Sequence, residues 1–93
     1  MPITTTRWDI TEHLGTDEEI AAYLEAVFAG GDANEIRDAL GHVARARGMT
    51  AVAEKAGITR AGLYKALGET GNPSFDTILA IVKALGVRLA VAA

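Results

Sequence analysis

The sequence predicts a mainly α-helical fold of five helices, with a short β-strand near each end of the chain. Apolar residues recur at helical spacing in several segments, and a capping residue or a glycine marks most boundaries between those segments. Near both ends, the residues instead follow a period of two, in which successive side chains belong to opposite faces, as in half-buried strands. At 93 residues the chain fits a single domain, 1–93.

Composition favours a folded protein without disulfides. Hydrophobic residues make up 49% of the chain and charged residues 23%, with two prolines and no cysteine. The lack of cysteine excludes disulfides and thiolate metal sites and is compatible with a reducing compartment. The sequence shows neither a signal peptide nor an apolar run that could span a bilayer, so we expect a cytoplasmic protein with no membrane partner.

The formal net charge of −3 conceals two halves of opposite sign. Residues 1–44 carry nine acidic residues against two basic ones, a formal charge of −7, whereas residues 45–93 carry seven basic residues against three acidic ones, a formal charge of +4. A basic half suits contact with phosphates, and an acidic half suits a basic protein partner. A solvated helix surface explains the acidic half equally well.

The first half of the chain contains an arm and two helices. Residues 1–16 form the arm, with a strand over Thr4–Ile10, and Thr16 with Glu19 makes a capping box that begins an acidic helix over 17–29. The apolar face of this helix is Ile20, Tyr23, Leu24, Val27 and Phe28. Asp32 with Glu35 repeats the capping-box pattern and begins the next helix, which ends at Arg47. The predicted buried stripe of this helix is Ile36, Ala39, Leu40, Val43 and Ala46.

The chain ends with a helix and a strand. Gly68–Pro73 is a loop, and Ser74 caps a helix that Gly86 ends. The apolar residues of this helix are Phe75, Ile78, Leu79, Val82 and Leu85. Residues 87–93 alternate as a strand, which pairs with the N-terminal strand, across a dimer axis or with a partner protein, because an isolated strand leaves its backbone groups unpaired.

Between these parts, Met49–Leu67 has the pattern of two short helices joined by a tight turn. Thr50 can cap the first helix, Gly57 ends it, and Thr59 caps the second, which covers Arg60–Leu67. This is the pattern of a helix-turn-helix, whose second helix enters the major groove of DNA. The segment therefore predicts a DNA-binding core, which we place over residues 33–86.

The outward face of the second helix of this motif carries the candidate DNA contacts. Arg60 can bond two acceptors on a guanine or grip a phosphate, Tyr64 can reach a phosphate or a thymine methyl group, and Lys65 suits a phosphate. The predicted DNA-binding residues are Thr50, Thr59, Arg60, Ala61, Tyr64 and Lys65.

Gly62 is unexpected inside this helix, because glycine in a helix interior costs about 1 kcal/mol relative to alanine. Two hypotheses explain it. Either the helix packs closely against the preceding helix, or its backbone approaches DNA closely. Both require a missing side chain.

Catalytic and metal sites are not predicted. His13 and His42 are the only histidines, and neither has a second ligand at metal-binding spacing. Asp38 and His42 are one helical turn apart, which is the spacing of an ordinary surface pair. Gly57–Gly62 lacks the lysine of a phosphate-binding loop. We therefore expect no enzymatic activity and no cofactor.

Most of the chain resembles the addiction-module antidote proteins, the HigA-like antitoxins of type II toxin-antitoxin pairs. The segments that carry the resemblance are EEIAAYLEA (Glu18–Ala26), ALGHVARARGMT (Ala39–Thr50), ITRAGLYKAL (Ile58–Leu67) and GNPSFDTILAIVKALGV (Gly71–Val87). The last of these also resembles the wider Xre and phage-repressor class. The resemblance implies a five-helix lambda-repressor-like helix-turn-helix domain and a homodimer that represses its own operon at a double-stranded DNA operator. It also implies a cognate RelE/ParE-like toxin as a partner.

The first helix of the motif departs from that wider class. It is about two residues shorter, and Ala51 and Val52 follow Thr50 where many repressors have a Gln or Glu. A phosphate contact there would come from Thr50 or from backbone N–H groups. Two alternatives to the DNA-binding antitoxin remain: a solitary Xre-type regulator without a toxin, and a toxin-neutralising module with little DNA binding.

Overall fold

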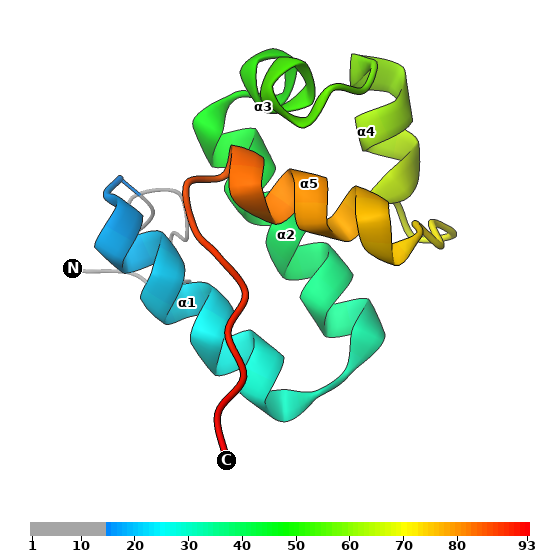
Figure 1. Ribbon diagram of the computed structural model, residues 1–93. Coiled ribbons are helices and arrows are strands. Elements are labelled where there is room, and N and C mark those ends of the chain that lie inside the picture. Colours follow the sequence, from blue (N-terminus) through cyan, green and yellow to red (C-terminus); the bar gives the residue numbers. More distant parts are fainter. Residues whose placement is uncertain (1–14) are drawn as a thin grey trace, which may run out of the picture.

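The computed structural model describes residues 15–93, and within this range the chain forms five α-helices and no β-strand (Figure 1). The helices are α1 (Asp17–Gly30), α2 (Ala33–Arg47), α3 (Met49–Ala56), α4 (Arg60–Ala66) and α5 (Phe75–Ala84). The prediction of five helices is confirmed, and the strand predicted over Thr4–Ile10 lies outside the described residues. None of these helices is long and apolar enough to cross a membrane.

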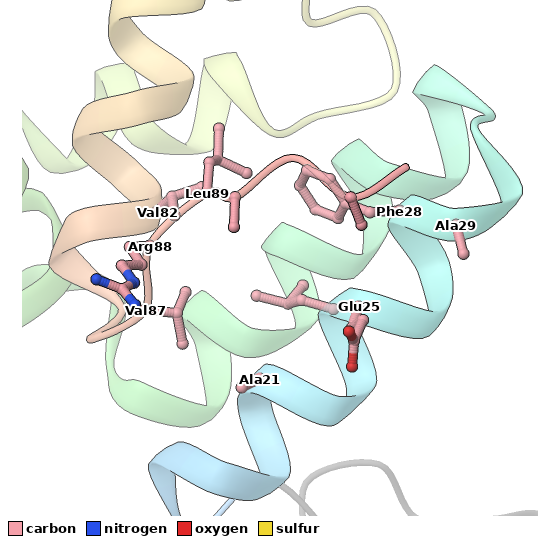
Figure 2. A pocket seen from close by; sticks show the side chains of 11 residues that line it. Ala21, Glu25, Phe28, Ala29, Val82, Val87, Arg88 and Leu89 are labelled. Carbon is pink, nitrogen blue, oxygen red and sulfur yellow. The ribbon is translucent and has the colours of Figure 1, made fainter.

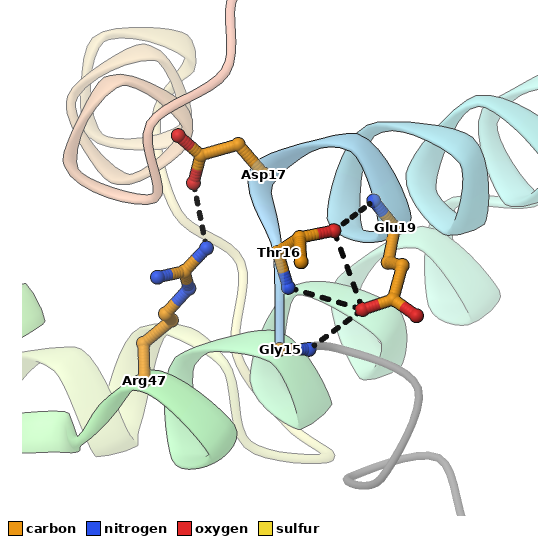
Figure 3. A network of polar contacts seen from close by, with 5 residues as sticks. All are labelled: Gly15, Thr16, Asp17, Glu19 and Arg47. Atoms are coloured by element: carbon orange, nitrogen blue, oxygen red, sulfur yellow. Dashed lines mark hydrogen bonds and ion pairs between the residues drawn. The ribbon is translucent and has the colours of Figure 1, made fainter.

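Predicted helix caps account for the starts of α1, α2 and α5, and a fourth predicted cap, Thr59, begins α4. At α1 the capping box is confirmed, because the N–H of Glu19 donates to Thr16 Oγ1 and the N–H of Thr16 donates to Glu19 Oε1, each at 3.1 Å (Figure 3). The side chains of Asp32 and Ser74 accept backbone N–H groups at the starts of α2 and α5. These bonds satisfy donors that have no partner inside a helix.

Helices α1 and α2 form an antiparallel hairpin. Arg47, the last residue of α2, donates to Asp17, the first residue of α1, over 2.6 Å between Nη2 and Oδ1 (Figure 3). Further along, the Tyr23 hydroxyl lies 3.2 Å from His42 Nδ1. The ion pair is largely exposed, so it contributes little stability, but it joins the start of the acidic helix to the end of α2.

The core lies where α5 crosses the other helices, and α5 packs chiefly against α3 (Figure 1). Every described helix contributes at least one buried side chain to it. The largest fully buried side chains are Ile20, Leu40, Val43, Val52, Leu63, Ile81 and Val82. Because α4 enters this core through Leu63, the core fixes how α4 presents its other face.

The buried face of α5 differs from the predicted one. Phe75 is 67% exposed, whereas Ile81, which the predicted stripe omitted, is fully buried. Phe75 lies in the first turn of α5, before the helix reaches the core, so its side chain stays in solvent. Ala46 on α2 is also exposed, and the buried position is Ala44 instead, one turn after Leu40.

The predicted C-terminal strand does not form within the described residues. Residues 87–93 form an extended but irregular tail that runs along α1 (Figure 1). Within residues 15–93 its one backbone bond runs from the N–H of Val87 to the carbonyl of Val82, at 3.4 Å. The alternation of the tail is real in the sequence, but a strand also requires a paired neighbour.

Replacing Tyr23 with phenylalanine is expected to lower the free energy of unfolding by about 1 kcal/mol, because His42 loses its partner. Burial, and secondarily the charge of Asp38, raises the pKa of the Tyr23 hydroxyl above 10.0. The contribution of this hydroxyl is therefore complete below pH 10 and is lost as the pH rises through the raised pKa. Urea titrations at neutral and alkaline pH check this. An unchanged midpoint at pH 7 would show that the contact contributes nothing.

Candidate nucleic-acid interface

Helices α3 and α4 are joined by the short turn Gly57–Thr59. Gly57 has a φ of 75°, in the left-handed region that glycine adopts readily, and it ends α3 as predicted. The N–H of Ile58 donates to the carbonyl of Ala53 at 3.0 Å, which completes the helix end. Thr59 Oγ1 accepts the N–H of Gly62 at 2.9 Å and so caps α4 as predicted.

Helix α4 has one face in the core and one in solvent. Leu63 and Leu67 are buried, so this side holds the helix against the rest of the fold. The exposed face carries Arg60, Ala61, Tyr64 and Lys65, which are four of the six predicted DNA contacts. The structure therefore brings these four side chains together on one accessible surface.

Arg60 and Tyr64 contact each other on this surface. Arg60 Nη2 donates to the Tyr64 hydroxyl at 3.4 Å, and the guanidinium carbon lies 5.4 Å from the centre of the tyrosine ring. This is the distance range of a cation–π contact. The ring is 46% exposed, so both side chains remain accessible while they restrict each other's rotamers.

Thr50 does not cap α3, so that prediction is wrong. The helix begins at Met49, two residues earlier than a cap at Thr50 implies, and the residue at its cap is Gly48, which has a φ of 99° and no capping side chain. Met49 is buried, so the chain enters the helix directly after the glycine. Thr50 then lies in the first turn of α3 with an exposed side chain.

Gly62 does not pack closely against α3, so that hypothesis is wrong. A Cβ atom at this position would meet Thr59 Oγ1 at 3.0 Å, and no atom of α3 would lie within 4 Å of it. The one close neighbour is the hydroxyl that caps the same helix. The hypothesis of a close approach to DNA stays a prediction.

Replacing Gly62 with alanine separates stability from binding. The gain in helix propensity and the crowding of the Thr59 cap oppose each other, so we expect the free energy of unfolding to change by less than about 1 kcal/mol. DNA affinity should nevertheless fall if the α4 backbone approaches DNA closely. Thermal melts and gel-shift titrations of the same preparation measure both. Unchanged affinity would rule out the close approach.

Arg37 has a structural role that the sequence did not reveal. Its Nη1 donates to the carbonyl of Gly71 at 3.0 Å and its Nη2 to the carbonyl of Glu69 at 2.9 Å. These bonds tie α2 to the loop that follows α4. The only signal for it in the sequence is that Arg37 lies between two acids on α2, Glu35 and Asp38.

The acidic residues of the first half that the structure describes are all exposed. Two of the three acids in the first turn of α1 already have partners, because Asp17 pairs with Arg47 and Glu19 belongs to the capping box. Glu18 and Glu25 make no side-chain hydrogen bond or ion pair within residues 15–93. The free acidic surface of α1 is therefore smaller than its composition suggests.

The described residues do not assemble a metal-binding cluster. No group of three His, Asp or Glu residues within 15–93 could hold a metal ion. His42 is half-buried and lies against Tyr23, so it does not form the surface pair with Asp38 that was predicted. His13 lies outside the described residues.

Comparison with known proteins decides the family. The family described as "Probable addiction module antidote protein" matches residues 4–93. The chain belongs to this antidote family. It is also 46% identical over 84 residues to an uncharacterized protein of Haemophilus influenzae, an alignment that covers 90% of this chain and 87% of that protein. No solved structure gives a significant match.

Membership of the antidote family gives the chain an antitoxin role. An antidote of an addiction module acts on a toxin, so a cognate toxin is its implied partner. The family is not one of enzymes.

Proposed function

We propose that this antidote is a sequence-specific DNA-binding antitoxin of the HigA-like type, whose α3 and α4 form an Xre-type helix-turn-helix. In this proposal the whole chain is one domain, and a homodimer represses its own operon. The observation that carries the proposal is the exposed face of α4, where Arg60 and Tyr64 contact each other while Leu63, on the opposite side, is fully buried. A short helix anchored in this way can enter the major groove as a rigid unit.

Each residue of the α4 face has chemistry that suits DNA. Arg60 has further guanidinium donors besides the one bonded to Tyr64 and can reach two acceptors on a guanine, and Ala61 can touch a thymine methyl group. Lys65 and the Tyr64 hydroxyl suit phosphates, which position the protein without reading sequence. Thr59 keeps its capping bond and contributes through it, by holding the start of α4 in place.

Binding to the DNA upstream of its own gene tests this proposal. We expect a gel shift at nanomolar protein with that DNA, and at least about 1,000-fold weaker binding to a duplex of the same composition in scrambled order. The titrations belong at one fixed salt concentration, because phosphate contacts make affinity depend steeply on salt. Equal affinity for the two duplexes would contradict sequence-specific repression.

We further propose that the toxin is a basic, RelE/ParE-like protein attracted by the acids of α1. Glu18 supports this, because it is exposed and free of any partner within the described residues. The neighbouring genes discriminate between two functions. An adjacent small basic reading frame favours the antitoxin, whereas its absence favours a solitary regulator. A toxin-neutralising module with little DNA binding is the alternative if the gel shift fails while toxin binding persists.

Reversing the charge of Glu18 tests the attraction. Co-purification of the neighbouring gene's product should decline with Glu18→Lys, and the loss should be smaller in high salt, where charge attraction is screened. Glu54→Lys is the matched control, because it makes the same charge change at an exposed position on α3. Equal recovery with both variants at low salt would contradict recognition through α1.

A further inference from the structure

An apolar groove runs between α1 and the C-terminal tail, residues 87–93 (Figure 2). Its volume is about 480 Å³, and nine of its eleven lining residues are apolar. Leu24 and Phe28 on α1 form one wall, Val87 and Leu89 on the tail form the other, and Val82 of α5 also lines the groove. The groove lies away from α4, so it is separate from the proposed DNA-binding face (Figure 1).

The tail that forms one wall is open to a partner. Beyond Val87, none of its backbone groups makes a backbone hydrogen bond to any residue in 15–93. The side chain of Val91 is fully exposed and that of Leu89 is 38% exposed. An extended segment with free backbone groups and exposed aliphatic side chains is ready to pair with another extended segment.

The two charged residues of the groove have opposite signs and lie on opposite walls. Glu25 projects from α1 and Arg88 from the tail (Figure 2), and no ion pair joins them. In a two-fold symmetric interface, if one residue of the first copy contacts a second residue of the partner, then that second residue of the first copy contacts the first residue of the partner. A groove with one carboxylate and one guanidinium is therefore complementary to itself, because Arg88 of each copy can face Glu25 of the other.

We propose that this groove is the homodimer interface, and that its occupant is the C-terminal tail of a second copy of the chain. Leu89 and Val91 of each tail enter the groove of the other copy, and the two tails pair along their free backbone edges. The groove carries no net charge, so it does not attract a basic toxin. Such a toxin would instead be drawn to Glu18, an unpaired acid that lies outside the groove. This inference rests on the proposed function in one respect, because reading two half-sites requires a two-fold dimer.

Charge exchange between the walls tests the interface. The groove has eleven lining residues, fewer than the roughly 20 to 30 residues per side of a standard interface, so we expect a weak dimer. The full chain is therefore studied by sedimentation velocity at protein concentrations from about 1 to 100 µM. We expect a dimer for the wild type. Glu25→Arg and Arg88→Glu should each raise the dimer dissociation constant at least about tenfold, and the double variant should restore it to within about threefold.

Glu54→Arg is the matched control, because it reverses an exposed charge outside the groove, on α3. It should leave the dissociation constant unchanged, and thermal melts of all variants verify that they fold. A monomeric wild type, single variants that remain dimeric, or a double variant as weak as the singles would each overturn the proposed interface.

Gel shifts of the same proteins keep the two proposals distinguishable. If the single groove variants remain dimeric and still bind two half-sites, the interface is wrong and the proposed function stands. If the wild type is a dimer and the single and double charge variants change its dissociation constant as predicted, but the wild type shows no sequence preference, the interface stands and the DNA-binding proposal is wrong.

Discussion

Replacing Arg60 with alanine is expected to weaken operator binding by ~1 to 3 kcal/mol, or about 5- to 150-fold, and to flatten the base preference. Arg60 is exposed at the first position of α4, and its contact with Tyr64 restricts the guanidinium before DNA arrives. The loss should therefore be greatest for the preferred sequence and small for unrelated DNA. Gel-shift titrations at fixed salt, with both kinds of duplex, measure the difference.

Two controls separate base reading from charge. Arg60→Lys keeps the positive charge but cannot form the planar double contact, so it should lose specificity while its salt dependence stays close to that of the wild type. Lys83→Ala removes a positive charge from the exposed surface of α5 and should cost little specificity. An Arg60→Ala protein with wild-type affinity and base preference would remove Arg60 from the interface.

Replacing Gly71 with alanine is expected to lower the free energy of unfolding by about 2 to 3 kcal/mol, through overpacking. A Cβ atom there would lie 2.2 Å from the carbonyl oxygen of Ala66 and 2.7 Å from that of Lys65. Both atoms belong to the backbone of α4, so they cannot move aside cheaply. The carbonyl of Gly71 also accepts a hydrogen bond from Arg37, and a shifted loop would strain that bond.

Gly30→Ala is the matched control for this substitution. Gly30 is the last residue of α1, and a Cβ atom there would meet only Glu35 Oε1, at 4.0 Å, so alanine should be neutral or slightly stabilising. Chemical denaturation of both variants makes the comparison. A Gly71→Ala protein as stable as Gly30→Ala would show that the loop after α4 is not held as closely as its geometry indicates.

The helices could be predicted from the sequence because their ends are encoded locally. Thr16, Ser74 and Thr59 cap helices through bonds to residues three positions further on, and Gly57 ends α3 in a backbone conformation that few other residues adopt. The outward face of α4 was predictable for the same reason. Leu63 and Leu67 are one turn apart and fix which side is buried, which leaves Arg60 and Tyr64 outside.

The features that depend on distant contacts could not be predicted. Helical spacing allowed either Phe75 or Ile81 on the buried face of α5, and the crossing of α5 over α3 decides for Ile81. The tail alternates like a strand but has no paired neighbour within the described residues. Arg37 bonds to carbonyls more than 30 positions away, and no local pattern encodes such a contact.

Selection of bound duplexes from a random pool tests the central claim most directly, because it examines sequence reading and two-fold symmetry together. The full chain is mixed with the pool at physiological salt, and the enriched sequences are compared with the input. We expect two inverted half-sites whose centres lie about one helical turn, roughly 10 base pairs, or a multiple of it apart. A bound pool with no enriched sequence, or with one half-site that never occurs in pairs, would contradict a dimeric DNA-binding antitoxin.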